Sequence, residues 1–303
     1  MTTEIPIRSA DRSEGHTVAV AVADNTRLRI AGRLTAALAV AVLVAAGGTL
    51  AVPGVLRGTP VMNGSARGTA TVMLAVTLPV LLAAAALARR GSARAHVVWL
   101  GAAGHLTYNG VLLLLATPMN RLFLAYTTSV GLAIATVVAV AAAVDVRDLA
   151  ARFSPATPAR GVAAYLGVDV ALNTFLWLSD VVPATVEGDT SFLDGTGLTT
   201  NPIYAQDLAV WLPLAGLAAW WLWHRRPWGY LAGGAMLVTW VIEAVSVATD
   251  QWLGGSADPS SSVASTSMTL PFAVLAVVGL VPTLLLLRHV DEHVDEHVDD
   301  GTR

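Results

Sequence analysis

Polar and ionisable side chains interrupt several long apolar runs of this sequence, at spacings that would bring them together to bind a ligand or carry protons. The run at residues 96–116 contains His105, Tyr108 and Asn109. Their spacing of three and four residues places them on one face of a helix. A charged group in a lipid-spanning helix costs about 2.5–3.5 kcal/mol, so we expect this face to meet protein or water.

Two later runs carry acidic residues in the same way. Asp169, Asn173 and Asp180 lie on a narrow stripe of one run, and Glu243 lies in another. Such groups either bind a ligand or pair with one another and hold helices together. For Asp169 and Glu243 we favour a functional role, because burying a carboxylate is costly. For His105 both interpretations stay open.

Three further candidates lie close to the ends of their runs. Arg121 and Tyr126 precede or begin one run, and Asp207 lies near the start of another. We expect Arg121 to pair with Asp180 or Asp207 at the outer surface, because these are the nearest carboxylates in the predicted arrangement.

The depth of these residues indicates a pocket. At a rise of ~1.5 Å per residue, His105 and Asp169 fall near the middle of their helices, whereas Asn109, Asn173 and Glu243 fall in the outer halves. The sequence therefore predicts a polar pocket lined by the third to seventh apolar runs and open to the extracytoplasmic side.

Composition identifies the elements that must position these residues. Apolar residues make up 55% of the chain and charged residues 13%, which is about half of the usual globular share. Backbone groups in lipid must satisfy their own hydrogen bonds, which favours helices, and the runs lack the alternation of a β-barrel. We therefore predict an all-α, polytopic transmembrane helical bundle whose partner is the lipid bilayer, and no nucleic-acid binding.

The apolar runs predict eight spans. They lie at residues 30–51, 69–87, 96–116, 122–144, 161–181, 203–223, 229–249 and 268–287. The membrane domain then covers residues 30–288, between a disordered cytoplasmic tail at 1–29 and an acidic, His-rich tail at 289–303.

Arginine placement predicts the orientation. All 18 basic residues are Arg. With eight spans and the N-terminus inside, Arg57, Arg67 and Arg121 alone fall outside, which follows the positive-inside rule. The prediction is a multi-pass protein of the cell membrane with both termini cytoplasmic. An acidic loop at residues 182–202 then lies on the extracytoplasmic face, above the predicted pocket.

Several chemistries are excluded or weakly supported. The chain has no Cys and no Lys, so thiolate catalysis, Cys-ligated metals and Schiff-base chemistry are excluded. No P-loop, metalloprotease or nucleophile-elbow motif is present, so we predict no catalytic residues, no cofactor and no metal site. The repeats HVDE, HVDE and HVDD at the C-terminus would align three His on one helix face, but a solvated tail is the favoured interpretation.

Four segments resemble an uncharacterised family of bacterial polytopic membrane proteins. They are VPGVLRGTP at 52–60, TPMNRLFLAY at 117–126, GTGLTTNPIYAQDLAVWLP at 195–213 and RRPWGY at 225–230. The resemblance covers roughly residues 45–290 and implies architecture, without an activity.

The function that these features favour is transport or sensing of a small molecule or ion through the pocket. The alternative is a membrane scaffold or assembly factor that binds partners through residues 182–207, and an intramembrane enzyme comes third. The first four and last four spans show no convincing mutual match, which argues against a carrier built from repeats.

Overall fold

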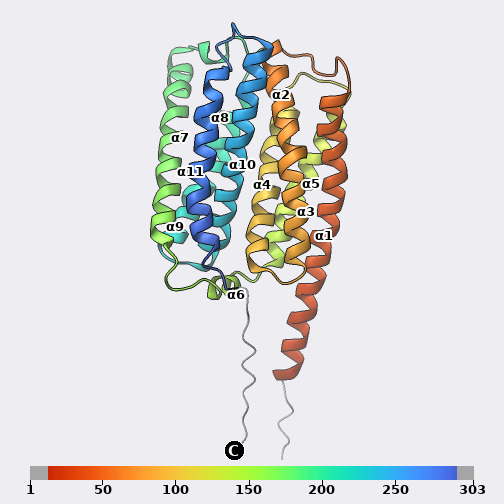
Figure 1. Cartoon of the computed structure of the whole chain (residues 1–303), viewed down its shortest axis with the longest axis vertical. Coiled ribbons are helices and arrows are strands. Elements are labelled where there is room, and N and C mark those ends of the chain that lie inside the picture. The colour runs from red at the N-terminus through yellow and green to blue at the C-terminus, as the bar shows by residue number, and fades with distance from the viewer. Residues whose placement is uncertain (1–12, 292–303) are drawn as a thin grey trace, which may run out of the picture.

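A computed structural model of the chain describes residues 13–291, with side chains from Thr26 onward, as a bundle of α-helices (Figure 1). The helices are α1 (Ser13–Ala51), α2 (Pro60–Val72), α3 (Leu78–Ala88), α4 (Ala93–Leu115), α5 (Phe123–Ala143), α6 (Val146–Ala151), α7 (Ala159–Glu187), α8 (Pro202–Gln206), α9 (Leu212–Trp223), α10 (Pro227–Ala257) and α11 (Thr269–Leu287). Two π-helices, η1 (Met73–Thr77) and η3 (Asp207–Trp211), join α2 to α3 and α8 to α9. No strand occurs among the described residues, so the all-α prediction is confirmed.

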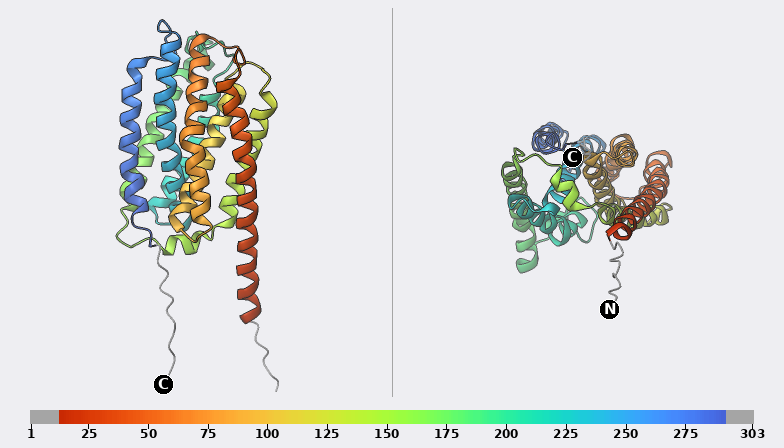
Figure 2. Two further views of the ribbon diagram at one scale, coloured as in Figure 1. Left: turned by 45° about the vertical axis from the view of Figure 1, so that its right-hand side comes forward. Right: turned by 90° about the horizontal axis from the view of Figure 1, so that it is seen from below.

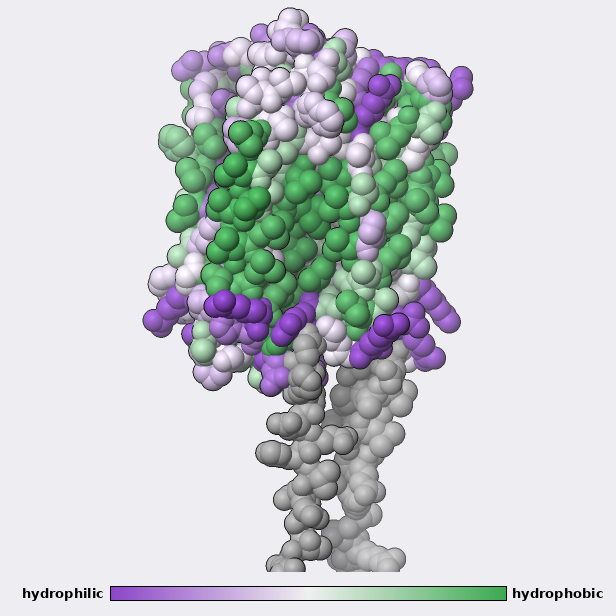
Figure 3. All heavy atoms as spheres, viewed as in Figure 1, coloured by the Kyte–Doolittle hydropathy of each residue, from purple (hydrophilic) through white to green (hydrophobic). Residues whose placement is uncertain are grey.

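Seven helical stretches are long and apolar enough to cross a membrane. An apolar band crosses the middle of the visible face, and hydrophilic residues lie at both of its ends (Figure 3). The helical stretch from Pro202 to Trp223 is not among the seven, and it carries Gln206, Asp207 and several Trp residues. The chain is therefore a multi-pass membrane protein by the length and composition of its helices.

Several helices extend beyond the predicted spans. The second begins at Pro60 rather than residue 69, so most of the expected outer loop before it is helical. Similarly, α7 continues to Glu187 and α10 to Ala257, which shortens the connections that follow them. The first helix begins at Ser13, inside the expected tail. Residues 1–12 and 292–303, including most of the His-rich tail, lie outside the described residues.

The helices form two adjoining groups, each with its own apolar core. One core is built from α1 to α5, and the other from α6, α7, α9, α10 and α11 with the start of α4. Figures 1 and 2 show the two groups side by side, with α4 and α10 at the junction. At this junction α10 packs closely against both α2 and α4.

The two π-helices occupy equivalent places in the two groups. Each contains the start of a nearly identical segment, LAVTLP at 74–79 and LAVWLP at 208–213. The proline lacks an N–H and clashes with the carbonyl four residues earlier, so the preceding turn widens. The N–H groups of Leu78 and Leu212 accordingly donate to carbonyls five residues back.

The equivalence continues into the next helix of each group. The pairs Met73 and Asp207, Leu78 and Leu212, and Ala93 and Pro227 are each 134 positions apart. The same shift relates Asn109 of α4 to Glu243 of α10, and their side chains hydrogen-bond to each other at 2.5 Å. The expectation that the two halves do not match is therefore wrong for this part of the chain. The match is hard to recognise in the sequence, because a short shared segment does not stand out among so many Leu, Ala and Val residues.

Candidate functional site

A cavity of about 410 Å³ lies at the junction of the two helix groups. Helices α2, α4, α7, α8, α9, α10 and α11 and the π-helix η3 contribute its walls. Along α10 the lining runs from Leu237 to Gln251, which is about 21 Å at the rise of an α-helix. One end of the cavity is lined by Met62 and Thr117 and lies near the loops at the end of the bundle opposite α6.

The π-helix η3 places Asp207 in the wall of this cavity. Trp177 of α7 donates its indole N–H to Asp207 Oδ2 at 2.8 Å, and the hydroxyl of Tyr108 donates to the same oxygen at 3.4 Å. Asp207 is 8% exposed. A carboxylate with so little access to water depends on these donors for its solvation.

A second cluster of polar side chains is centred on Glu243 and extends behind the cavity wall. Asn109 Nδ2 donates to Glu243 Oε2 at 2.5 Å and lies 3.1 Å from His105 Nε2. His105 Nε2 also lies 3.4 Å from Glu243 Oε2, and on the other side of the ring His105 Nδ1 is hydrogen-bonded to Thr77 Oγ1 at 3.0 Å. Thr77 then donates to the Val72 carbonyl at 3.3 Å. The network thus links Glu243 to the widened turn of η1 through a fully buried His105.

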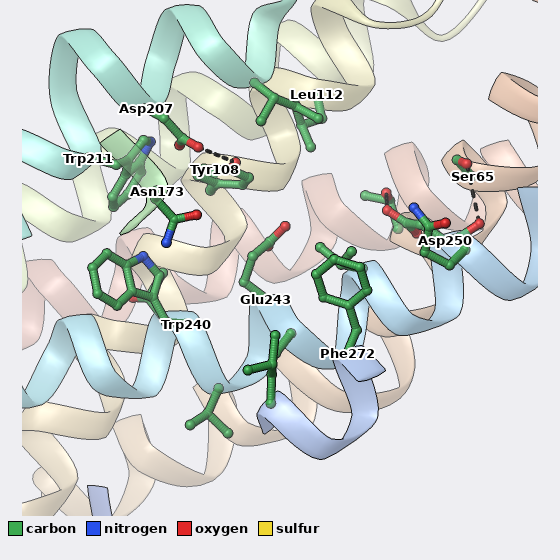
Figure 4. Close-up of a pocket in the computed structure, with 18 of the residues that line it drawn as sticks. Ser65, Tyr108, Leu112, Asn173, Asp207, Trp211, Trp240, Glu243, Asp250 and Phe272 are labelled. Atoms are coloured by element: carbon green, nitrogen blue, oxygen red, sulfur yellow. Dashed lines mark hydrogen bonds between the residues drawn. The ribbon is translucent and has the colours of Figure 1, made fainter. Parts of the chain in front are cut away.

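A third carboxylate, Asp250, lies further along α10 and contacts α2. Thr69 Oγ1 donates to Asp250 Oδ2 at 3.0 Å, whereas Asp250 Oδ1 is buried and has no hydrogen-bond partner. The helices approach closely here because Gly68 has no side chain. A Cβ at Gly68 would lie 2.8 Å from the backbone nitrogen of Asp250. In Figure 4, Glu243 projects between the Asp207–Tyr108 pair and Asp250.

The fourth carboxylate, Asp169, enters from α7, where Asn173 donates to the Asp169 backbone carbonyl at 2.9 Å. Aromatic rings form much of the remaining wall. They belong to Tyr108, Tyr165, Trp177, Trp211, Trp240 and Phe272. Tyr108 and Trp211 pack edge to face, with ring centroids 5.6 Å apart.

The electrostatic character of the cavity is acidic. Four carboxylates line it, and no Arg is among the described residues of its walls. The donors to these carboxylates are neutral hydroxyl, amide and indole groups of Thr69, Tyr108, Asn109 and Trp177. None of these four donors carries a positive charge, and the ring of His105 is the other ionisable group near Glu243, with Nε2 3.4 Å from Oε2.

The connection between α7 and α8 forms a rim at this end of the bundle. Gly188, Gly195 and Gly197 adopt positive φ angles, which L side chains rarely adopt. Phe192 stacks on Tyr204, which stacks in turn on Trp177 of the cavity wall. The backbone N–H of Ser191 donates to Asp189 and lowers the pKa of this exposed carboxyl. The loop is thus a folded structure joined to the cavity by stacked rings.

The predicted site residues divide into three sets. Tyr108, Asp169, Asn173, Asp207 and Glu243 line the cavity. His105 and Asn109 lie behind its wall and hydrogen-bond toward Glu243. Asp180 accepts a hydrogen bond from Tyr204 at 2.7 Å and lies outside the lining.

Two predicted residues lie elsewhere. Tyr126 is buried between α1 and α5, with its hydroxyl 2.8 Å from that of Thr49. The expected pairing of Arg121 is wrong, because Asp180 is bonded to Tyr204, Asp207 is bonded to Trp177, and neither forms an ion pair with Arg121 among the described residues. The predicted contribution of the fourth span to the cavity is also wrong, since α5 contributes no lining residue.

The prediction omitted residues from the second and last spans. Thr69 and Ser65 of α2 and Phe272 of α11 line the cavity, as does Asp250. Asp250 lies seven residues after Glu243, two turns along the same helix face, so its spacing was a detectable signal. The others lack a comparable signal, because small hydroxyl and aromatic side chains are common throughout membrane helices.

Comparison of the chain with protein-family models, with curated proteins and with solved structures found no match.

Proposed function

We propose that the protein is an eight-span transporter of the cell membrane that carries a small molecule through the cavity at the junction of its two helix groups. In this proposal both termini are cytoplasmic and the cavity opens to the extracytoplasmic side. The observation that carries the proposal is the collection of four carboxylates from α7, η3 and α10 around one cavity inside an apolar bundle.

The eight-span topology is supported by length and by Arg placement. The helical stretch from Pro202 to Trp223 has 22 residues, about 33 Å at helical rise, which matches the ~30 Å hydrocarbon core. At the end of the bundle near α6, Arg side chains bond the connecting segments to one another. Arg225 donates to the Thr157 carbonyl at 3.0 Å, and Arg94 donates to the Val290 carbonyl at 2.7 Å. That end is the cytoplasmic one by the positive-inside rule.

Transport is favoured over sensing by the relation between the two groups. Many carriers consist of two related halves, with the substrate site at their interface near the middle of the membrane. Here the shared LAV-x-LP segments, the paired π-helices and the Asn109–Glu243 contact lie beside the cavity. A site at the junction of related halves allows each half to move against the other around a bound ligand.

The alternative of a scaffold acting through residues 182–207 has less support. Residues 182–187 belong to α7, and the rings of Phe192 and Tyr204 stack within the protein. An intramembrane enzyme is also less supported, because His105 is bonded to Thr77 and Asn109, while Ser129 donates to the Tyr126 carbonyl. These groups do not form a nucleophile and base pair.

Cysteine accessibility tests this proposal, since the native chain has no Cys. In intact cells, the Asn173→Cys variant should react with a membrane-impermeant thiol reagent added outside. An Ala84→Cys variant, buried in the core of the first helix group, should not react, and Ser260→Cys in the outer loop should react. If Ser260→Cys is labelled and Asn173→Cys is not, the cavity is closed to the outside and the proposal fails.

A further inference from the structure

We propose that the cavity takes an organic cation, namely an ammonium group that carries apolar or aromatic substituents. The inference rests on the proposed function, because it assigns a ligand class to the same cavity. Four features support it: the acidic charge of the walls, a buried carboxylate oxygen without a partner, the aromatic rings and the separation of the carboxylates.

The charge of the walls selects the sign of the ligand. Asp169, Asp207, Glu243 and Asp250 line the cavity without a lining Arg among the described residues. A carboxylate in a low-dielectric interior is stabilised strongly by an opposite charge and strongly opposes a like one. An anion would meet repulsion on three sides, from α7, η3 and α10.

Buried polar atoms in this region lack partners within the protein. Asp250 Oδ1 is buried without a hydrogen-bond partner. The amide oxygen of Asn109, a residue with no exposed surface, is also unpaired, although its Nδ2 is bonded to Glu243. Such unpaired acceptors are costly inside a protein. Asn109 lies behind the wall, whereas Asp250 lines the cavity, so a cation bound there would offset the charge of Asp250.

The aromatic rings select the character of the cation. The cavity lining includes five Trp and Tyr residues, namely Trp177, Trp211, Trp240, Tyr108 and Tyr165. The faces of such rings attract cations, and cages of this kind recognise substituted ammonium groups. Apolar substituents would meet the remaining wall residues, including Leu112, Leu237 and Phe272. An inorganic ion would leave these surfaces without a partner.

The arrangement of the carboxylates argues against a bare metal ion. No group of three His, Asp or Glu residues among those described is close enough together to hold a metal. The acids are instead distributed along the cavity, from Asp207 past Glu243 to Asp250 (Figure 4), and Asp169 of α7 also belongs to the lining. A volume of about 410 Å³ falls in the range of small-molecule pockets.

The test uses benzyltrimethylammonium as the cation and benzenesulfonate as an anion of similar size. Binding to the purified full chain is measured by calorimetry, and protection of Asn173→Cys from the thiol reagent is measured in cells. We expect benzyltrimethylammonium to bind and to protect, whereas benzenesulfonate does neither. Glu243→Gln and Asp207→Asn should each weaken cation binding by at least about tenfold, because each removes one negative charge that attracts the cation.

Two further variants separate the roles of charge and ring. Trp240→Leu should weaken binding by roughly threefold to tenfold through loss of a cation–π contact. Asp180→Asn is the matched control, because this carboxylate lies outside the lining, and its binding should equal that of the native chain.

Two binding results overturn the inference. One is tighter binding of benzenesulfonate than of benzyltrimethylammonium by the native chain, a comparison that does not depend on any variant folding. The other is cation binding unchanged in Glu243→Gln and Asp207→Asn alike. Labelling of Asn173→Cys without protection by the cation would reject the ligand class alone, whereas absence of labelling would reject the proposed function.

Discussion

Glu243 and the residues behind it form the most extended side-chain network in the part of the chain that the structure describes. Its members come from η1, α4 and α10, and its end at Thr77 lies in a π-helix. The network holds Glu243 toward the cavity, because Asn109 joins Glu243 to the buried His105 and Thr77. His105 contacts both Asn109 and Glu243, and its role in this arrangement is to position them.

Replacing Thr77 tests this network. Thr77→Val keeps the shape of the side chain but leaves Nδ1 of His105 without its hydrogen-bond partner in a fully buried place. We expect the free energy of unfolding in detergent to fall by about 1–3 kcal/mol. Thr107→Val is the control, since its hydroxyl bonds only to the Ala103 carbonyl one turn earlier, and it should change stability by less. Equal effects of the two variants would contradict the network.

At the scale of helices, the close approach of α2 and α10 determines the shape of the cavity. Gly64 and Gly68 of α2 face the backbone of α10 around Leu253 and Asp250. A Cβ at either position would come within 3 Å of that backbone. Helix separation here would move Thr69 away from Asp250.

The Gly68→Ala variant measures this constraint. The added methyl group forces the two helices apart, and we expect a loss of about 1–3 kcal/mol in unfolding free energy. Gly47→Ala in α1 is the matched control, because no atom lies within 4 Å of its added Cβ. It should be neutral or slightly stabilising, since Ala favours a helix more than Gly. A neutral Gly68→Ala would show that the two helices can separate freely.

The helices themselves were largely predictable from hydropathy, because an apolar run near twenty residues has few alternatives in lipid. The helix ends were less predictable. The turns from Pro60 to Gly68 carry Asn63, Ser65 and Arg67, so they look like loop in the sequence although they are helical. Tyr108 and Glu243 each lie on the polar face of their own helix, and both line the cavity.

What the sequence did not reveal is the packing between distant helices. Tyr126 resembles the other polar candidates in type and depth, yet its partner is Thr49 of α1. The contribution of α11 to the cavity rests on Phe272, Leu275 and Gly279, which carry no polar signature. The π-helices were also not foreseen, although Pro79 and Pro213 mark the places where the turn must widen.

At the scale of the whole molecule, the number of crossings determines the side on which each end lies. Eight spans place both termini in the cytoplasm, whereas the seven strongly apolar stretches alone would place them on opposite sides. Fusion of a fluorescent protein that matures only in the cytoplasm should give a signal at either terminus. A signal from one end alone would contradict the eight-span arrangement, and a signal from neither end would reverse the side of the cavity.

The most direct test of transport through the cavity is counterflow of radiolabelled benzyltrimethylammonium into proteoliposomes preloaded with the unlabelled cation. We predict uptake by the native chain and by Asp180→Asn, and uptake near the level of protein-free vesicles for Glu243→Gln. Equal uptake by native protein, Glu243→Gln and protein-free vesicles would contradict the proposal that this cavity carries an organic cation across the membrane.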